Sequence, residues 1–81
     1  MRRLPRDLSG AELVQALVAL GYRCTRQKGS HMRLTTASNG EHHVTIPCHD
    51  PLRIGTLGSI LDSIAEHFGL TRDELLNRLF P

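Results

Sequence analysis

The residues with the clearest chemical capacity lie in one short run, from Lys28 to Leu34. Polar and apolar side chains alternate there, and a period of two is typical of a half-buried strand whose neighbouring side chains point to opposite faces. Met32 and Leu34 would then face a core, while His31 and Arg33 share the solvent side. An imidazole can move protons at neutral pH, and a neighbouring guanidinium suits a phosphate-containing partner. We expect this run to be the functional site, with His31 as a general acid or base; the alternative is an ordinary exposed histidine.

The sequence contains four further histidines, any of which could supply a second acid or base. His42 and His43 are adjacent and point to opposite faces of a strand, so only His43 should share the face of His31. His49 follows the end of the same predicted strand, where it could approach the site or cap the next segment. His67 lies late in a predicted helix, where a cation interacts well with the helix dipole, so we expect a structural role. His43 and His49 therefore stay open as the second group.

Positive charge is concentrated in the half of the chain that holds this run. Residues 1–33 contain seven basic and two acidic residues, whereas residues 34–81 contain three basic and six acidic ones. Such a field attracts an anion such as nucleic acid and speeds its encounter with the protein. Lys28 and Arg33 could also stabilise charge that grows on a phosphate.

Other chemistries match the sequence less well. Five histidines and two cysteines suggest zinc, but no C-x-x-C or H-x-x-x-H pair is present, and Cys48-His49 is the only place where a cysteine and a histidine are close together in sequence. The chain has no nucleophile elbow for a serine hydrolase, and its glycines are too scattered for a phosphate loop. We therefore expect no metal and no cofactor.

A chain of 81 residues suffices for one domain, residues 1–81, with one thin core, so an active site should be a shallow surface. No apolar run approaches the length of a membrane span, and the start of the chain lacks the apolar block of a signal peptide. We expect a soluble, cytoplasmic protein without a membrane partner. Cys24 and Cys48 are too few for a disulfide scaffold and are expected to be reduced and partly buried.

Capping and turn signals divide the chain into regular elements. Ser9 and Glu12 fit a capping box, Asn39-Gly40 is a strong hairpin signal, and Thr56 is a plausible N-cap. The expected elements are a helix over 10–20, strands over 22–26, 30–36 and 41–47, a helix from 56 to about 68, and a short helix opened by a capping box at 71–74. This order predicts an α+β fold in which a three-stranded antiparallel meander lies between helices.

An antiparallel sheet commonly packs one face on helices and leaves the other in water. The predicted core face carries Tyr22, Cys24, Met32, Leu34, Val44 and Ile46. The predicted open face carries Arg23, Thr25, His31, Arg33, His43 and Thr45. Both outer strands are edges to which a partner could add.

Several short motifs occur in order over about residues 8–65. They are Ser9-Gly10, Gly21-Tyr22, Arg26-Gln27-Lys28-Gly29-Ser30-His31, Ile46-Pro47-Cys48-His49, Gly55-Thr56-Leu57 and Ile60-Leu61. Together they resemble the HicA toxins of bacterial and archaeal toxin–antitoxin pairs. Typical members end soon after the second long helix, whereas here that helix is followed by another, opened at Thr71.

The resemblance implies a fold like a double-stranded-RNA-binding domain and the activity of an mRNA interferase, an endoribonuclease that cleaves mRNA independently of the ribosome. It also implies that His31 is the family's essential histidine. A HicB-like antitoxin would cover the site in a toxin–antitoxin hetero-oligomer, and such complexes commonly repress their own operon. The residues expected to contact RNA are Lys28, Arg33, Arg23, Arg26 and Ser30.

Two other functions stay open. A non-catalytic RNA-binding module could have the same fold, although readers of that kind usually carry lysines at the start of the last long helix, and residues 55–59 contain none. The third possibility is a protein-interaction subunit that has lost toxicity.

Overall fold

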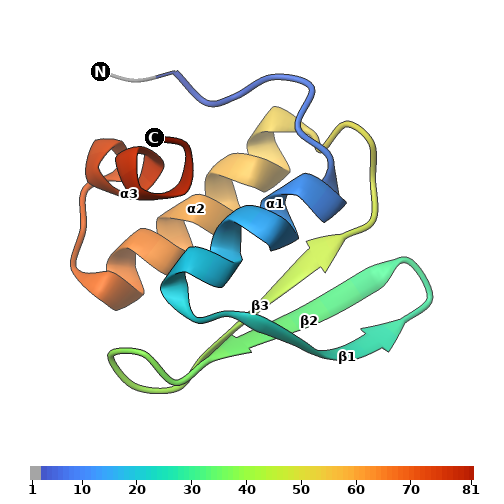
Figure 1. The fold of residues 1–81 in the computed structure, drawn as a ribbon. Helices are drawn as coiled ribbons and strands as arrows, with labels where there is room; N and C mark the ends of the chain where they lie inside the picture. Colours follow the sequence, from blue (N-terminus) through green and yellow to red (C-terminus); the bar gives the residue numbers. More distant parts are fainter. Residues whose placement is uncertain (1–2) are drawn as a thin grey trace.

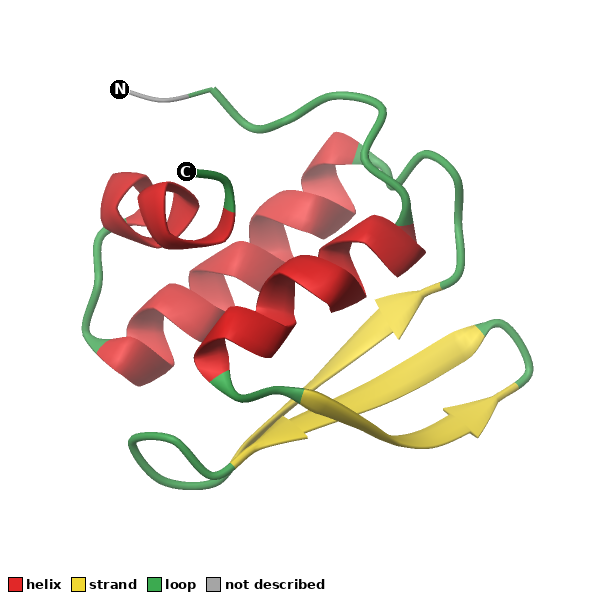
Figure 2. Cartoon of the chain, in the orientation of Figure 1, coloured by secondary structure: helices red, strands yellow, loops and turns green. Residues whose placement is uncertain are grey.

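Helices and sheet form two layers in the computed structural model, which describes residues 3–81 (Figures 1 and 2). The elements in chain order are α1 (Gly10–Leu17), the 3-10 helix η1 (Val18–Leu20), β1 (Arg23–Lys28), β2 (His31–Thr36), β3 (His42–Pro47), α2 (Ile54–Phe68) and α3 (Arg72–Leu79). The helices lie on one side of the sheet, and its other face carries no helix (Figure 2). The predicted α+β arrangement of helix, three-stranded meander and helix is confirmed.

The first helix begins where its capping signal predicts. The Ser9 hydroxyl accepts a hydrogen bond from the Glu12 amide, and the Glu12 carboxylate accepts one from the Ser9 amide, both at 3.0 Å. These bonds lower the pKa of Glu12 below its usual value, the backbone bond most of all. The α-helix ends at Leu17, earlier than predicted, and η1 tightens the chain up to Gly21, whose φ of 81° lies in the left-handed region that favours glycine.

The strands follow the predicted order, β1-β2-β3, and both neighbouring pairs are antiparallel. Asn39 and Gly40 lie in the turn from β2 to β3, with positive φ values of 58° and 96° that suit these residue types. β1 runs further than predicted, to Lys28, so only Gly29 and Ser30 form the turn to β2.

The core lies between the sheet and helices α1 and α2. Tyr22, Leu34, Val44 and Ile46 are buried, as predicted for the core face. Cys24 is exposed, contrary to prediction, and Met32 is only half-buried. The helices pack mainly on β3, and β1 is an edge strand whose six residues are all exposed. The packing of the helices mainly on β3 leaves the side chains of this edge strand exposed.

Both cysteines, Cys24 and Cys48, are free and exposed. The expectation of reduced thiols holds, but the expectation that they are partly buried is wrong. Cys48 lies just after β3, in a connection that runs over the surface.

Gly10 connects the start of α1 to the segment that follows β3. Its amide donates a hydrogen bond to the carbonyl oxygen of His49 at 2.9 Å. A Cβ at this position would overlap the carbonyl oxygen of Pro47, so only glycine allows this approach. The contact places the segment after β3 beside the helix layer.

The second long helix, α2, begins two residues before the predicted N-cap Thr56. Arg53 takes the cap position without a side-chain hydrogen bond. Its buried side is aliphatic and includes Leu57, Leu61 and Ile64, as the sequence periodicity predicts. Within the described part of the chain, no helix is long and apolar enough to cross a membrane.

The last helix, α3, packs against α2 and adds to the same core. Its predicted capping box is present, because Thr71 and Glu74 exchange side-chain and backbone hydrogen bonds of 3.1 and 2.9 Å. Leu75 and Leu76 are almost completely buried. The Arg72 guanidinium donates to the Asp62 carboxylate of α2 at 2.6 Å.

Candidate nucleic-acid interface

A bulge in β1 decides which basic side chains share the open face of the sheet. Cys24 pairs with Leu34 and Arg26 pairs with Arg33, so Thr25 is an extra residue without a partner of its own. Directly opposite residues in an antiparallel pair point to the same face. Simple alternation from Cys24 would place Arg26 on the core face, and the bulge shifts it to the open face.

The register then sorts the open face into three rows, each with one residue from each strand. The rows are Lys28–His31–Pro47, Arg26–Arg33–Thr45 and Arg23–Thr35–His43. Successive rows are two residues apart, which is about 6.7 Å along a strand. Four of the five predicted RNA-contacting residues, all of them cations, therefore lie on one face over about 13 Å. We call this surface the basic face.

His31 occupies the end row of the basic face. It pairs with Lys28 on one side and with Pro47 on the other, and its side chain is exposed. Within residues 3–81, no side chain or backbone group forms a hydrogen bond or ion pair with its imidazole. The ring is therefore free to take the orientation that a bound partner imposes, as happens for catalytic groups whose hydrogen bonds form only in the complex.

Ser30 and His49 lie at the same end of the sheet as His31. The Cys48 amide donates to the Ser30 carbonyl oxygen at 2.6 Å, which continues the pairing of β2 and β3 by one step. The backbone of His49 therefore runs beside the Gly29–Ser30 turn. Both Ser30 and His49 are exposed.

His43 lies at the opposite end, in the row of Thr35. Thr35 is four residues from His31, so about 13 Å of strand separates the two histidine rows. His43 therefore lies two rows away from His31, with its ring in contact with Thr35 and Glu41. Of the two histidines predicted as a second group, His49 lies at the His31 end of the sheet and His43 at the other end.

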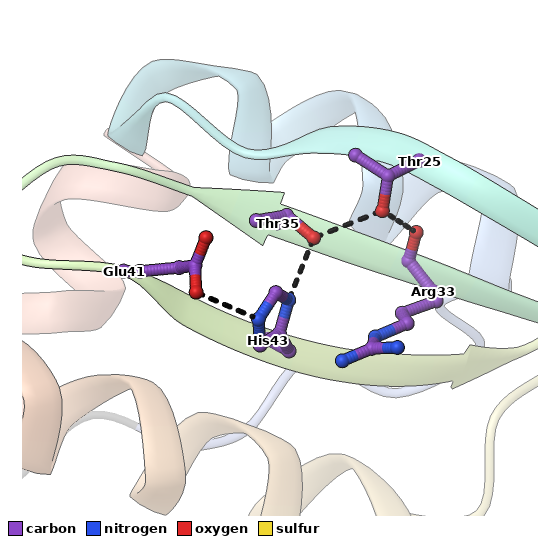
Figure 3. Close-up of polar contacts among 5 residues, drawn as sticks. All are labelled: Thr25, Arg33, Thr35, Glu41 and His43. Carbon is purple, nitrogen blue, oxygen red and sulfur yellow. Dashed lines mark hydrogen bonds and ion pairs between the residues drawn. The ribbon is translucent and has the colours of Figure 1, made fainter.

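A hydrogen-bonded chain runs across all three strands at the His43 end (Figure 3). Thr25 and Thr35 join their hydroxyl oxygens at 2.9 Å, and Thr35 Oγ1 lies 2.8 Å from His43 Nδ1. His43 Nε2 lies 3.4 Å from a carboxylate oxygen of Glu41. The Thr25 hydroxyl also donates to the Arg33 carbonyl oxygen at 3.4 Å. Alternation predicted that Thr25, Arg33 and His43 share a face, but it did not predict the hydrogen bonds that connect Thr25 and His43 through Thr35.

His42 belongs to the other face, as predicted, and has a structural role. Its Nδ1 lies 2.7 Å from the Tyr22 hydroxyl, and its ring stacks on that of His67 with centroids 4.5 Å apart. Burial lowers the pKa of His42, and the neighbouring His67 and His43 lower it further. Burial also raises the pKa of Tyr22 to about 12, so its hydroxyl stays protonated.

His67 joins α2 to the turn between β2 and β3. Its Nε2 donates to the Ser38 carbonyl oxygen at 2.9 Å, and Asn39 donates its side-chain amide to the His67 carbonyl oxygen at 2.8 Å. His67 therefore has the structural role predicted for it at the end of α2, and it has this role through its hydrogen bonds to the turn. Within the described residues, no group of three or more His, Cys, Asp or Glu side chains is arranged to hold a metal ion.

Together these features define an α+β domain with helices on one sheet face and an uncovered row of cations on the other. A family model described as the HicA toxin of bacterial toxin–antitoxin systems matches residues 10–69. The chain therefore belongs to the HicA toxin family, as the motif series indicated. The match ends at Gly69, the C-cap of α2, so α3 lies beyond it. No significant match is found among curated proteins or solved structures.

Proposed function

We propose that this HicA-family protein is the toxin of a type II toxin–antitoxin pair and cleaves mRNA without the ribosome. The observation that carries this proposal is the place of His31, exposed at the end of the basic face and paired with Lys28. An imidazole can accept a proton at neutral pH, and cations around it stabilise charge on a phosphate. Within a family of toxins, this combination supports cleavage of an RNA phosphodiester.

In the step that we propose, a ribose 2′-oxygen attacks the adjacent phosphorus and His31 accepts its proton. The bond from phosphorus to the leaving 5′-oxygen then breaks, and that oxygen takes up a proton. Lys28 in the same row and Arg33 in the next would hold the negative phosphate oxygens. Neither the attack nor the departure requires a metal ion, because the side chains supply both proton transfer and positive charge.

We assign the proton for the leaving oxygen to His49 as the first candidate and to His43 as the second. His49 follows Cys48, whose amide donates to the carbonyl oxygen of Ser30, the residue before His31. A single missing general acid or base commonly costs 10²–10⁴-fold in rate. His49→Ala should therefore slow cleavage by at least about a hundredfold if His49 is the acid.

We further propose that a HicB-like antitoxin covers the basic face. Its contact surface should be acidic, because an interface over exposed arginine and lysine side chains requires charge complementarity. Covering this face would block His31 and displace RNA at once. Such a complex is a hetero-oligomer in which the toxin's active surface is buried.

The test is cleavage of a labelled RNA by the purified wild-type protein and by His31→Ala, without ribosomes and with a chelator present. We expect cleavage by the wild type and a loss of about 10²–10⁴-fold in the variant. His31 is exposed and has no side-chain partner among the described residues, so its replacement should leave the melting temperature unchanged. Equal cleavage by both proteins would show that the assignment of His31 is wrong.

The same purified proteins distinguish a ribonuclease from the alternative, a non-catalytic RNA-binding module. RNA that is retained by the wild type on a filter, without cleavage at high protein concentration, would favour that alternative. Growth arrest by the wild type but not by His31→Ala, in a host without the antitoxin, would support the toxin.

A further inference from the structure

The sheet surface farthest from His31 contains a shallow depression of about 500 Å³. It is lined by Gly21, Arg23, Thr25, Thr35, Ala37 and Ser38. The depression therefore lies over the third row of the basic face, between β1 and the turn from β2 to β3. The cleavage step proposed above uses none of these residues.

Arg23 is the only cation in the lining, and its charge is uncommitted. Arg23 is exposed, and within residues 3–81 its guanidinium forms no hydrogen bond or ion pair. Glu41 contacts His43 at the β3 side of this row, whereas Arg23 lies on β1 at the other side. An anion in the depression would therefore meet Arg23 without competition from that carboxylate.

The hydroxyl chain supplies a second donor. Hydroxyl protons rotate, so the chain is satisfied in either direction. With a proton on both ring nitrogens, His43 donates from Nε2 towards the Glu41 carboxylate and from Nδ1 to Thr35. Thr35 then donates to Thr25, and Thr25 donates to the Arg33 carbonyl oxygen. That last bond, at 3.4 Å, is the longest hydroxyl bond of the chain, so a phosphate oxygen can replace the carbonyl as its acceptor. In this arrangement His43 is a positioning residue, which holds Thr35 and through it Thr25.

The distance between this depression and His31 fits a single RNA strand that contacts both. About 13 Å of β2 separates Thr35 from His31. A stacked strand advances about 3.4 Å per nucleotide, so about four nucleotides span the gap, and fewer do so if the strand is extended. Arg26 and Arg33 lie in the row between and would line the path.

We propose that the depression is a second phosphate subsite, in which Arg23 and the Thr25 hydroxyl bind a backbone phosphate of the strand that is cleaved at His31. This inference rests on the proposed function, because it assumes RNA on the basic face. It adds a specific consequence: RNA long enough to reach both places binds more tightly, and the added affinity depends on Arg23. RNA too short to reach the depression gains nothing from it.

The test compares a dinucleotide with an octanucleotide RNA, using Arg23→Gln and the control Arg78→Gln. Arg78 is an exposed cation on α3, away from the sheet. Cleavage of the dinucleotide requires its one phosphate at His31, so kcat/KM for it reports that end alone. We expect Arg23→Gln to lower kcat/KM for the octanucleotide about fivefold at 0.1 M salt, through KM, and to leave the dinucleotide unchanged. Thr25→Val, which keeps a β-branched shape without the hydroxyl, should act in the same direction.

Binding of a 2′-O-methyl octanucleotide, which cannot be cleaved by 2′-oxygen attack, separates the two proposals. If the wild type cleaves no RNA, the proposed function fails, while the affinities of Arg23→Gln and Arg78→Gln for this oligomer still decide the subsite. The subsite is overturned if Arg23→Gln binds as tightly as the wild type. It is also overturned if Arg78→Gln weakens binding equally, or if Arg23→Gln lowers dinucleotide cleavage as much as octanucleotide cleavage.

Discussion

Exchanging residues 26 and 27 tests whether RNA binding depends on the positive charge of the basic face or on the net charge of the chain. Arg26 pairs with Arg33 on the open face, whereas Gln27 pairs with Met32 on the opposite one, and both residues are exposed. The double variant Arg26→Gln/Gln27→Arg keeps the formal net charge of +2 and moves one guanidinium to the other side of the sheet. We expect it to bind RNA as weakly as the single variant Arg26→Gln.

The size of the effect follows from the number of cations on the face. For a single strand, the logarithm of the binding constant falls by about 0.7 per phosphate contact for each tenfold rise in salt. Four cations on the basic face predict a slope of about −2.8, and the loss of one gives about −2.1. We take the binding constants of the parent and the variant as equal at 1 M salt. At 0.1 M salt, the loss of one phosphate contact then weakens RNA binding about fivefold.

Fluorescence anisotropy of a labelled 2′-O-methyl octanucleotide, titrated at several salt concentrations from about 50 to 200 mM, measures both quantities. Arg78→Gln is the matched control, because it removes one exposed cation outside the sheet and should keep the parental slope. If the exchanged variant bound as tightly as the parent with the parental slope, total charge rather than the basic face would govern binding. The interpretation that the bulge favours RNA binding by placing Arg26 on the open face would then be wrong.

Three further predictions concern the scaffold. Gly10→Ala should lower the free energy of unfolding by about 1–3 kcal/mol in a urea titration, because the new methyl group overlaps the Pro47 carbonyl; an unchanged midpoint would refute the close approach. Stability should be greatest above pH 6.5 and fall as the pH drops from there to the lowered pKa of His42, because in that range the unfolded chain binds a proton at His42 that the folded chain does not. His42→Gln should flatten this part of the pH profile, and an equally steep profile would exclude His42 as its cause. Leu76→Ala should cost about 2–5 kcal/mol, since this side chain is almost completely buried, and a loss below about 1 kcal/mol would mean that α3 contributes little to the core.

The sequence predicted the elements whose signals are local. The capping boxes at Ser9 and Thr71 form as expected, because each needs only residues three positions apart. Alternation also predicted correctly which side chains of β2 and β3 face the core, since Leu34 and Ile46 are fully buried. The expected face of His31 followed from the same local rule.

The parts that sequence reasoning missed depend on pairing between distant residues. Alternation cannot reveal that Thr25 is skipped in the ladder, because the skip is defined by its partners on β2. Alternation with Tyr22 predicts Cys24 on the core face, but Cys24 lies on the exposed edge strand, whereas the helices pack mainly on β3. The stacking of His42 on His67 joins residues on different elements, and no spacing rule connects them.

The bulge in β1 meets two structural demands at once. An edge strand exposes unpaired backbone groups that can pair with another chain, and proteins suppress this with bulges and with lysine or arginine side chains on the edge. β1 contains both devices, at Thr25 and at Arg23, Arg26 and Lys28. Because the bulge also turns Arg26 to the open face, the charges that protect the edge become part of the surface beside His31. The same local irregularity therefore brings Arg26 and Lys28 to the face that carries His31.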